Sequence, residues 1–228
     1  MFVPTGGNTA GLGRNDTPSP SNGFFYWMPN STGNNGVVTV YGATSTGATQ
    51  TVIGSLDLNG SGNNTSLGFV RLGMGPDGKD GFWRVMGTDL YLARFASNGV
   101  IPVPLVLEDA NGVTLSGGAA STFQNGDICV SGNNTFYALA NNGSGVTQIF
   151  TGTPNGNSTT LTKKWDPVDQ NNNTFTGNVN GVAFDLIGSL YISTASGLYF
   201  INQNTVNGPA GTVQGSLVWT GSGLTDLA

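Results

Sequence analysis

A short sequence motif recurs four times along the chain and indicates that the fold is built from repeated units. In each copy, a glycine is followed by residues that alternate in character as they do in a β-strand. The copies begin at Gly23, Gly81, Gly126 and Gly188 and read GFFYWM, GFWRVM, GDICVS and GSLYIS. Successive copies begin 45 to 62 residues apart, which is the spacing of repeat units that contain several strands each.

Other strand-like segments flank each copy. In the last three copies a second strand begins nine or ten residues after the glycine, behind a polar turn, which is the pattern of a β-hairpin. A segment rich in small residues precedes each glycine. An outer strand follows each hairpin, at residues 49–53, 104–107, 147–150 and 216–219. Each unit is therefore predicted to hold four antiparallel strands.

Four such units predict an all-β fold, a β-propeller of four or five four-stranded antiparallel blades. We expect a single propeller domain over residues 1–228, with units at about 8–58, 66–110, 117–152 and 178–221. Segments 223–228 and 2–4 would close the ring or belong to a further blade, and we expect the chain to be a piece of a longer protein. A β-sandwich or jelly roll is the alternative, and an elongated β-solenoid is a third, but neither explains the recurring motif.

The composition agrees with many short strands and many turns. The chain has 37 glycines, only 8% charged residues and a single glutamate, Glu108. Glycine and asparagine supply tight turns, and threonine suits the exposed face of a strand. Helical proteins instead use Glu, Lys, Arg and Ala on their surfaces.

Charge and hydropathy exclude two classes of partner. The net charge is −5 and the only adjacent basic pair is Lys163–Lys164, so the chain lacks the positive surface that nucleic-acid binding requires. No apolar run approaches the ~20 residues of a membrane-spanning helix. We therefore expect neither nucleic-acid binding nor membrane insertion, and the N-terminal residues lack the pattern of a signal peptide.

Residues that carry chemistry are scarce. The chain has no histidine, which removes Ser-His-Asp triads and histidine metal sites. Cys129 is alone and lies in a strand-like segment, so we expect a small buried hydrophobe. Asp185 and Asp226 fall on predicted inner strands and are candidates for a pair of glycosidase carboxylates, although turn caps are the simpler interpretation. The segment 75–81 resembles a calcium loop but lacks the distal glutamate. No catalytic residue, metal or cofactor is predicted.

Aromatic side chains are the other candidates for binding. Trp27 and Trp83 share one position of the repeat, which favours packing between blades, and Trp219 ends a predicted outer strand. Trp165 falls in KKWDP at 163–167, between the third and fourth units. We therefore expect Trp165 to lie exposed in a loop and to bind a ligand by stacking.

The segment 181–205 resembles repeats of extracellular bacterial β-propellers, of the kind found in large surface proteins of the Bacteroidetes type. The resemblance is carried by GVAFD, GSLYIS and GLYFINQNT, and LTDLA at 224–228 is similar to their inner strand. The first two units depart from this pattern. The resemblance implies export and a role at the cell surface, and it implies no catalytic residues.

These observations lead to a functional hypothesis with two alternatives. The main hypothesis is a non-enzymatic extracellular or cell-surface module for adhesion or structural assembly, part of a large adhesin or filament. Its partners would be other protein subunits or cell-surface glycans. The first alternative is a carbohydrate-binding propeller or a degenerate glycoside-active enzyme. The second is a structural subunit of an extracellular lattice or virion.

Overall fold

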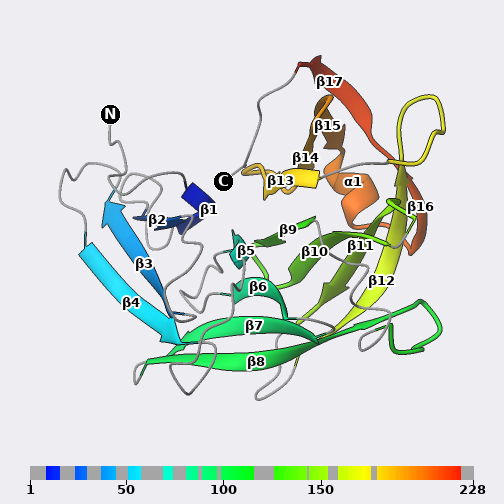
Figure 1. Ribbon diagram of the computed structural model, residues 1–228. Coiled ribbons are helices and arrows are strands. Elements are labelled where there is room, and N and C mark those ends of the chain that lie inside the picture. Colours follow the sequence, from blue (N-terminus) through cyan, green and yellow to red (C-terminus); the bar gives the residue numbers. More distant parts are fainter. Residues whose placement is uncertain are drawn as a thin grey trace.

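The computed structural model describes residues 9–15, 24–29, 37–44, 51–57, 69–73, 81–86, 89–96, 99–115, 126–142, 144–153, 159–175 and 179–221, and describes side chains from residue 105 onward within these ranges. Most of these residues lie in β-strands, and α1 (Gln203–Val206) is the helix among them. The described strands form four groups that follow one another along the chain (Figure 1).

Each group is a blade, in which the first strand lies nearest the centre of the molecule and the last strand lies at its rim. Blade 1 consists of β1 (Thr9–Asn15), β2 (Phe24–Pro29), β3 (Val37–Thr44) and β4 (Thr51–Asp57). Blade 2 consists of β5 (Phe69–Gly73), β6 (Gly81–Met86), β7 (Asp89–Ala96) and β8 (Gly99–Glu108).

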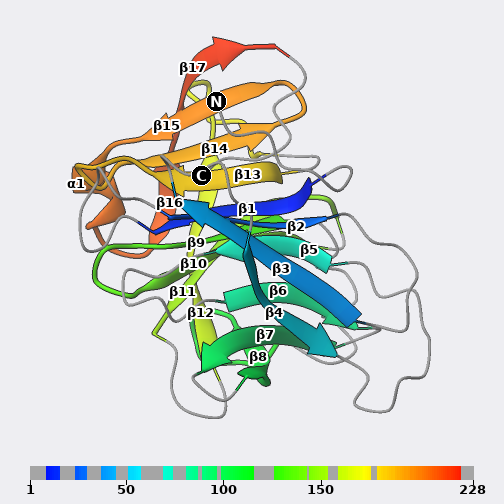
Figure 2. The ribbon, with the colours of Figure 1, turned by 90° about the vertical axis from the view of Figure 1, so that its left-hand side faces the viewer.

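Blades 3 and 4 follow the same plan. Blade 3 consists of β9 (Gly126–Val130), β10 (Phe136–Asn141), β11 (Thr147–Gly152) and β12 (Thr159–Val168). Blade 4 consists of β13 (Val179–Phe184), β14 (Leu190–Thr194), β15 (Gly197–Ile201) and β17 (Ser216–Thr220), and Figure 2 shows its strands side by side.

The first strands of the blades lie against one another. β1 contacts β5, β5 contacts β9, and β9 contacts β13. In Figure 1 these strands lie toward the middle, while β4, β8, β12 and β17 lie at the outside. This radial arrangement of antiparallel blades is a β-propeller, so the predicted fold class is confirmed.

Blade 3 departs from the predicted pattern. The predicted unit ended at residue 152, but β12 continues the blade to Val168. The motif at Gly126 forms the innermost described strand of its blade, whereas the other three copies lead into second strands. The small-residue segment 119–123, which we expected to be the inner strand, lies outside the described residues. We missed β12 because Pro167 and three charged residues interrupt it, and outer strands tolerate both features.

Outer strands also join neighbouring blades. The first half of β12 pairs in parallel with β8, from Thr159 opposite Leu105 to Thr162 opposite Glu108, and its later residues pair with β11. The same path recurs further on. β16 (Gly211–Gln214) pairs in parallel with β12, and β17 then pairs with β15. Strand β12 thus begins beside blade 2 and ends in blade 3, and the segment from β16 to β17 passes from blade 3 to blade 4 in the same way.

Two apolar cores fill the spaces on either side of blade 3. Alternate residues of its strands point to opposite faces. Toward blade 2, Ile128, Phe136 and Phe150 pack with Leu105 and Leu107. Toward blade 4, the second core contains Tyr137, Leu139, Ile149, Trp165, Val182, Leu190, Ile192 and Ile201. Apolar side chains therefore pack blade 3 against the end of β8 in blade 2 and against blade 4.

Candidate functional site

The position of Trp165 differs from the prediction. Trp165 lies in strand β12 rather than in a loop, and its side chain is 1% exposed. Its indole Nε1 donates a hydrogen bond to the carbonyl oxygen of Pro209 at 3.0 Å, and the Lys164 ammonium lies 4.3 Å from the ring centre. The predicted exposure is therefore wrong. Ligand binding by Trp165 stays a prediction. The buried ring has no open face on which a ligand could stack.

A β-bulge explains why Trp165 is buried. Phe150 is paired with Lys163 and Ile149 with Trp165, so Lys164 is an extra residue in β12. An inserted residue reverses which face the following side chains occupy. Leu161 therefore packs into the core next to blade 2, while Trp165 packs into the core next to blade 4. Simple alternation along the sequence cannot show this reversal.

Half of the described carboxylate side chains, three of six, hold the backbone of turns. In three turns, the Oδ1 atom of an aspartate accepts hydrogen bonds from the backbone N–H groups two and four residues later. These are Asp109, Asp169 and Asp185. The amide oxygen of Asn142 accepts the equivalent pair of bonds in the turn between β10 and β11. Asp185, proposed above for a catalytic pair, is thus a turn residue, and Asp226 lies outside the described residues.

The turn hydrogen bonds change the acidity of these groups. For Asp109, the N–H groups of Val113 and Asn111 lower the carboxyl pKa below its usual 3.8. For Asp169, the N–H group of Asn173 is the largest cause of a lowered pKa. Hydrogen bonds to the ionised form favour ionisation. Both carboxylates are therefore stabilised as anions that accept hydrogen bonds from backbone N–H groups.

Asp127 joins two blades at their inner strands. It is buried on β9, and its Oδ2 accepts a hydrogen bond from the backbone N–H of Val182 on β13 at 2.5 Å. Two residues along, Cys129 is buried as predicted. Burial and then the nearby Asp127 raise the pKa of the Cys129 thiol. A thiol with a raised pKa is a poor nucleophile. Asp127 and Cys129 therefore have structural roles, as a hydrogen-bond acceptor between blades and as a buried apolar side chain.

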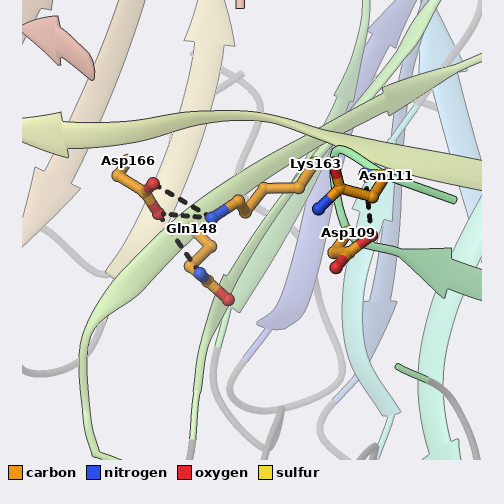
Figure 3. A network of polar contacts seen from close by, with 5 residues as sticks. All are labelled: Asp109, Asn111, Gln148, Lys163 and Asp166. Atoms are coloured by element: carbon orange, nitrogen blue, oxygen red, sulfur yellow. Dashed lines mark hydrogen bonds and ion pairs between the residues drawn. The ribbon is translucent and has the colours of Figure 1, made fainter. Parts of the chain in front are cut away.

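A polar cluster lies on the outer part of blade 3 (Figure 3). The Lys163 ammonium contacts both oxygens of Asp166, at 3.0 and 3.3 Å, and Gln148 Nε2 donates to Asp166 Oδ1 at 3.2 Å. Lys163 also lowers the pKa of Asp109, although it is the smallest of the causes. Gln148 and Asp166 connect β11 to β12 beside the bulge. With Asp166 40% exposed, such a pair adds little stability, and its oxygens face solvent.

Trp219 is the exposed aromatic residue among the described side chains. It lies on β17, the outer strand of blade 4, and is 44% exposed. One side of its indole ring packs on the backbone of Gly221, where any Cβ atom would collide with the ring. The ring thus lies against Gly221 on one side, with part of its surface open. A glycine two residues after the tryptophan was the sequence signal for this arrangement.

The described residues form neither a cluster of metal ligands nor a membrane-spanning helix. No three His, Cys, Asp or Glu side chains in these ranges are grouped closely enough to hold a metal ion. The described helix, α1, has four residues, and no helix in these ranges is long and apolar enough to cross a membrane.

Comparison with solved structures gives two similar proteins. The GH43_1 enzyme from Xanthomonas citri, solved in complex with xylotriose, is 11% identical with a TM-score of 0.50, over 94% of this chain and 76% of that chain. A putative gluconolactonase is 12% identical with a TM-score of 0.47, over 99% of this chain and 86% of that one. No protein-family model and no curated protein sequence matches the chain.

The similarity to the Xanthomonas citri enzyme supports a propeller fold, because that enzyme is a β-propeller. It also corrects two predictions. The prediction of a non-enzymatic surface module and the prediction that the chain is no enzyme are contradicted, since this structure with the same fold is an enzyme. The absence of histidine does not exclude glycoside hydrolysis, which uses carboxylates. At 11% identity the similarity itself concerns the fold.

Proposed function

We propose that this chain is a carbohydrate-active β-propeller that recognises a glycan through Trp219. The observation that carries the proposal is the partly exposed indole on the outer strand of blade 4, which rests on Gly221. An exposed aromatic face provides a flat apolar contact area, and the C–H face of a sugar ring packs on such a surface.

Two other observations support the proposal. The Xanthomonas citri enzyme that shares this fold was solved with xylotriose, a sugar. The chain also carries few charges and many glycine, asparagine, serine and threonine residues, so its surface is mostly neutral and able to form hydrogen bonds. The proposal includes a place of action outside the cell, with glycans as partners.

Titration calorimetry with xylotriose and a glycan array test the proposal on the whole chain. Stacking on an aromatic ring is worth about 0.5–1.5 kcal/mol beyond the area buried. We therefore expect Trp219→Ala to weaken glycan binding about tenfold, since 1.4 kcal/mol is a factor of ten. Val218→Ala is the matched control, because Val218 is exposed on the same strand and is not aromatic.

Release of reducing sugar from the bound glycan, measured on the same sample, reports whether the chain also cleaves it. Absence of any glycan that binds, or equal affinity in wild type and Trp219→Ala, would contradict recognition through Trp219. An unchanged melting temperature in Trp219→Ala shows that a loss of binding is not a loss of the fold.

A further inference from the structure

Trp219 belongs to a strip of apolar side chains across blade 4. Leu198 on β15 is paired with Trp219 on β17, and Phe200 lies two residues further along the same face of β15. Tyr191 on β14 is paired with Phe200, and their ring centres are 5.3 Å apart. These four residues are called the blade 4 strip below. Since strands lie about 4.8 Å apart, the strip extends about 10 Å across three strands.

The strip lies on the face of blade 4 that points away from blade 3. The alternate residues of the same strands, Leu190, Ile192 and Ile201, are buried in the core shared with blade 3, and Tyr199 packs against that core. By contrast, Tyr191, Leu198 and Phe200 are part-buried and Trp219 is exposed. The strip thus presents a surface that the core with blade 3 does not use.

Blade 4 has almost no charge with which to bind an ionic ligand. Residues 179–221 contain one charged side chain, Asp185. Its carboxylate accepts two backbone hydrogen bonds in the turn before Leu190. Leu190 is paired with Ile201, at the opposite end of β15 from Leu198, so this turn lies away from Trp219. The two lysines of β12 are engaged elsewhere, with Asp166 and with the carbonyl oxygen of Val206.

Hydroxyl groups lie beside the tryptophan instead of charges. Ser196 and Thr220 are exposed, and the carbonyl oxygen of Ser196 accepts the N–H of Gly221, which brings the turn between β14 and β15 next to Trp219. Ser196 Oγ also lies 3.2 Å from the hydroxyl of Thr194. An apolar platform bordered by neutral hydrogen-bonding groups matches a ligand with C–H faces and hydroxyl edges.

We infer that the blade 4 strip binds an uncharged saccharide longer than one sugar ring. This inference rests on the proposed function and adds the chemical class and the minimum length of the ligand. Since residues 179–221 of blade 4 carry no cation, an acidic sugar would find no group on this blade to compensate its desolvation, and neutral glycans are favoured. A strip three strands wide contacts more than one ring, so binding strengthens with chain length.

Calorimetry with neutral xylo-oligosaccharides of one to four rings, and with matched oligosaccharides that carry a uronic acid, tests the inference on the full chain. We expect affinity to rise at least tenfold from one ring to three. We also expect it to change less than twofold between 20 and 500 mM salt, because no ion pair contributes. Tyr191→Ala should weaken binding of three rings and leave one ring unchanged, whereas Trp219→Ala should weaken both.

Tyr199→Phe is the matched control, since Tyr199 lies on the other face of β15 and packs against Phe175 at 4.3 Å between ring centres. If Tyr191→Ala unfolds, Phe200→Leu removes a ring of the strip while keeping apolar volume. Preference for the acidic series, or affinity independent of length, would overturn the inference while leaving glycan recognition intact. Failure of every glycan to bind overturns the proposed function itself. Concentration-dependent dimerisation abolished by Trp219→Ala would show that a second copy occupies the strip, and would also overturn the inference.

Discussion

At the scale of single residues, one hydrogen-bond pattern recurs in the described turns. A short oxygen-bearing side chain accepts a backbone N–H four residues later, and the residue before that donor has a positive φ angle. The first position is Asp109, Ser131, Asn142, Asp169 or Asp185, and the fourth is Gly112, Asn134, Gly145, Asn172 or Gly188. Glycine and asparagine adopt this left-handed conformation most readily. The turn chemistry is local, which is why the sequence predicts turns well.

The lowered pKa of Asp169 makes its turn sensitive to acid. A carboxyl group whose pKa is lower in the folded chain than the usual 3.8 stabilises the fold when ionised. That contribution is present above pH 3.8 and is lost as the pH falls through the lowered folded value. Asp169→Asn keeps an acceptor that does not titrate. We expect wild type to be more stable than Asp169→Asn near pH 7, with the two converging in acid below pH 3.8.

Urea unfolding followed between pH 2 and pH 7 measures this difference. The matched control is Asn142→Asp, which places a titrating acceptor in an equivalent turn and should add acid sensitivity rather than remove it. A difference between wild type and Asp169→Asn that stays constant through the whole pH range would show that the carboxylate does not carry the effect.

At the scale of elements, strand β12 shows where local reasoning failed. It carries Lys163, Lys164, Asp166 and Pro167, which argue against a strand when taken alone. Its pairing with β8 on one side and β11 on the other makes it one. Because the strand was missed, Trp165 was assigned to a loop. The bulge then decided which core the tryptophan enters, and no pattern in residues 159–168 reveals it.

Deletion of Lys164 should leave Trp165 in its core and damage the fold little more than replacement of Lys164. Without the extra residue, Trp165 would follow Lys163 directly, so it would still lie opposite Ile149 and face blade 4. A shift of the strand register is needed to turn Trp165 to the side of Leu161, and loss of a buried tryptophan from a core costs about 3–5 kcal/mol. Lys164→Ala keeps the residue count and removes one hydrogen bond and the contact with the ring, which costs about 1 kcal/mol.

Thermal and urea unfolding of the two variants provide the comparison. Tryptophan fluorescence reports on the environment of Trp165, with a Trp219→Phe background to isolate its signal. A deletion that costs about 3 kcal/mol or more beyond the substitution would mean that Trp165 leaves its core and that its pairing with Ile149 does not set its face.

At the scale of the whole molecule, blades 3 and 4 are joined by backbone pairing and a buried hydrogen bond as well as by apolar packing. β16 adds to the edge of β12 in parallel before the chain continues as β17 in blade 4. Asp127 bridges the inner strands, and one apolar core spans both blades. Neither blade has a separate core on this side, so the two should unfold together.

Ile192→Ala tests whether the two blades are cooperative. Ile192 is fully buried on β14 in blade 4, and its truncation should cost about 2–5 kcal/mol. Native-state hydrogen exchange should then show lower protection in β10 and β11 of blade 3 as well as in β13 to β15. Thr212→Ala, on an exposed position of β16, is the control. Loss of protection confined to blade 4 would indicate independent blades.

The sequence by itself determined the class of fold, because strand alternation, turn residues and the recurring glycine motif are all local properties. It also identified Cys129 as buried. The tertiary structure decided the rest: that β12 is a strand, that Trp165 is buried, and that Trp219 stays half open on Gly221. These outcomes depend on which face of a strand meets the next blade, and a single inserted residue reverses that face without any mark in the pattern of hydrophobicity.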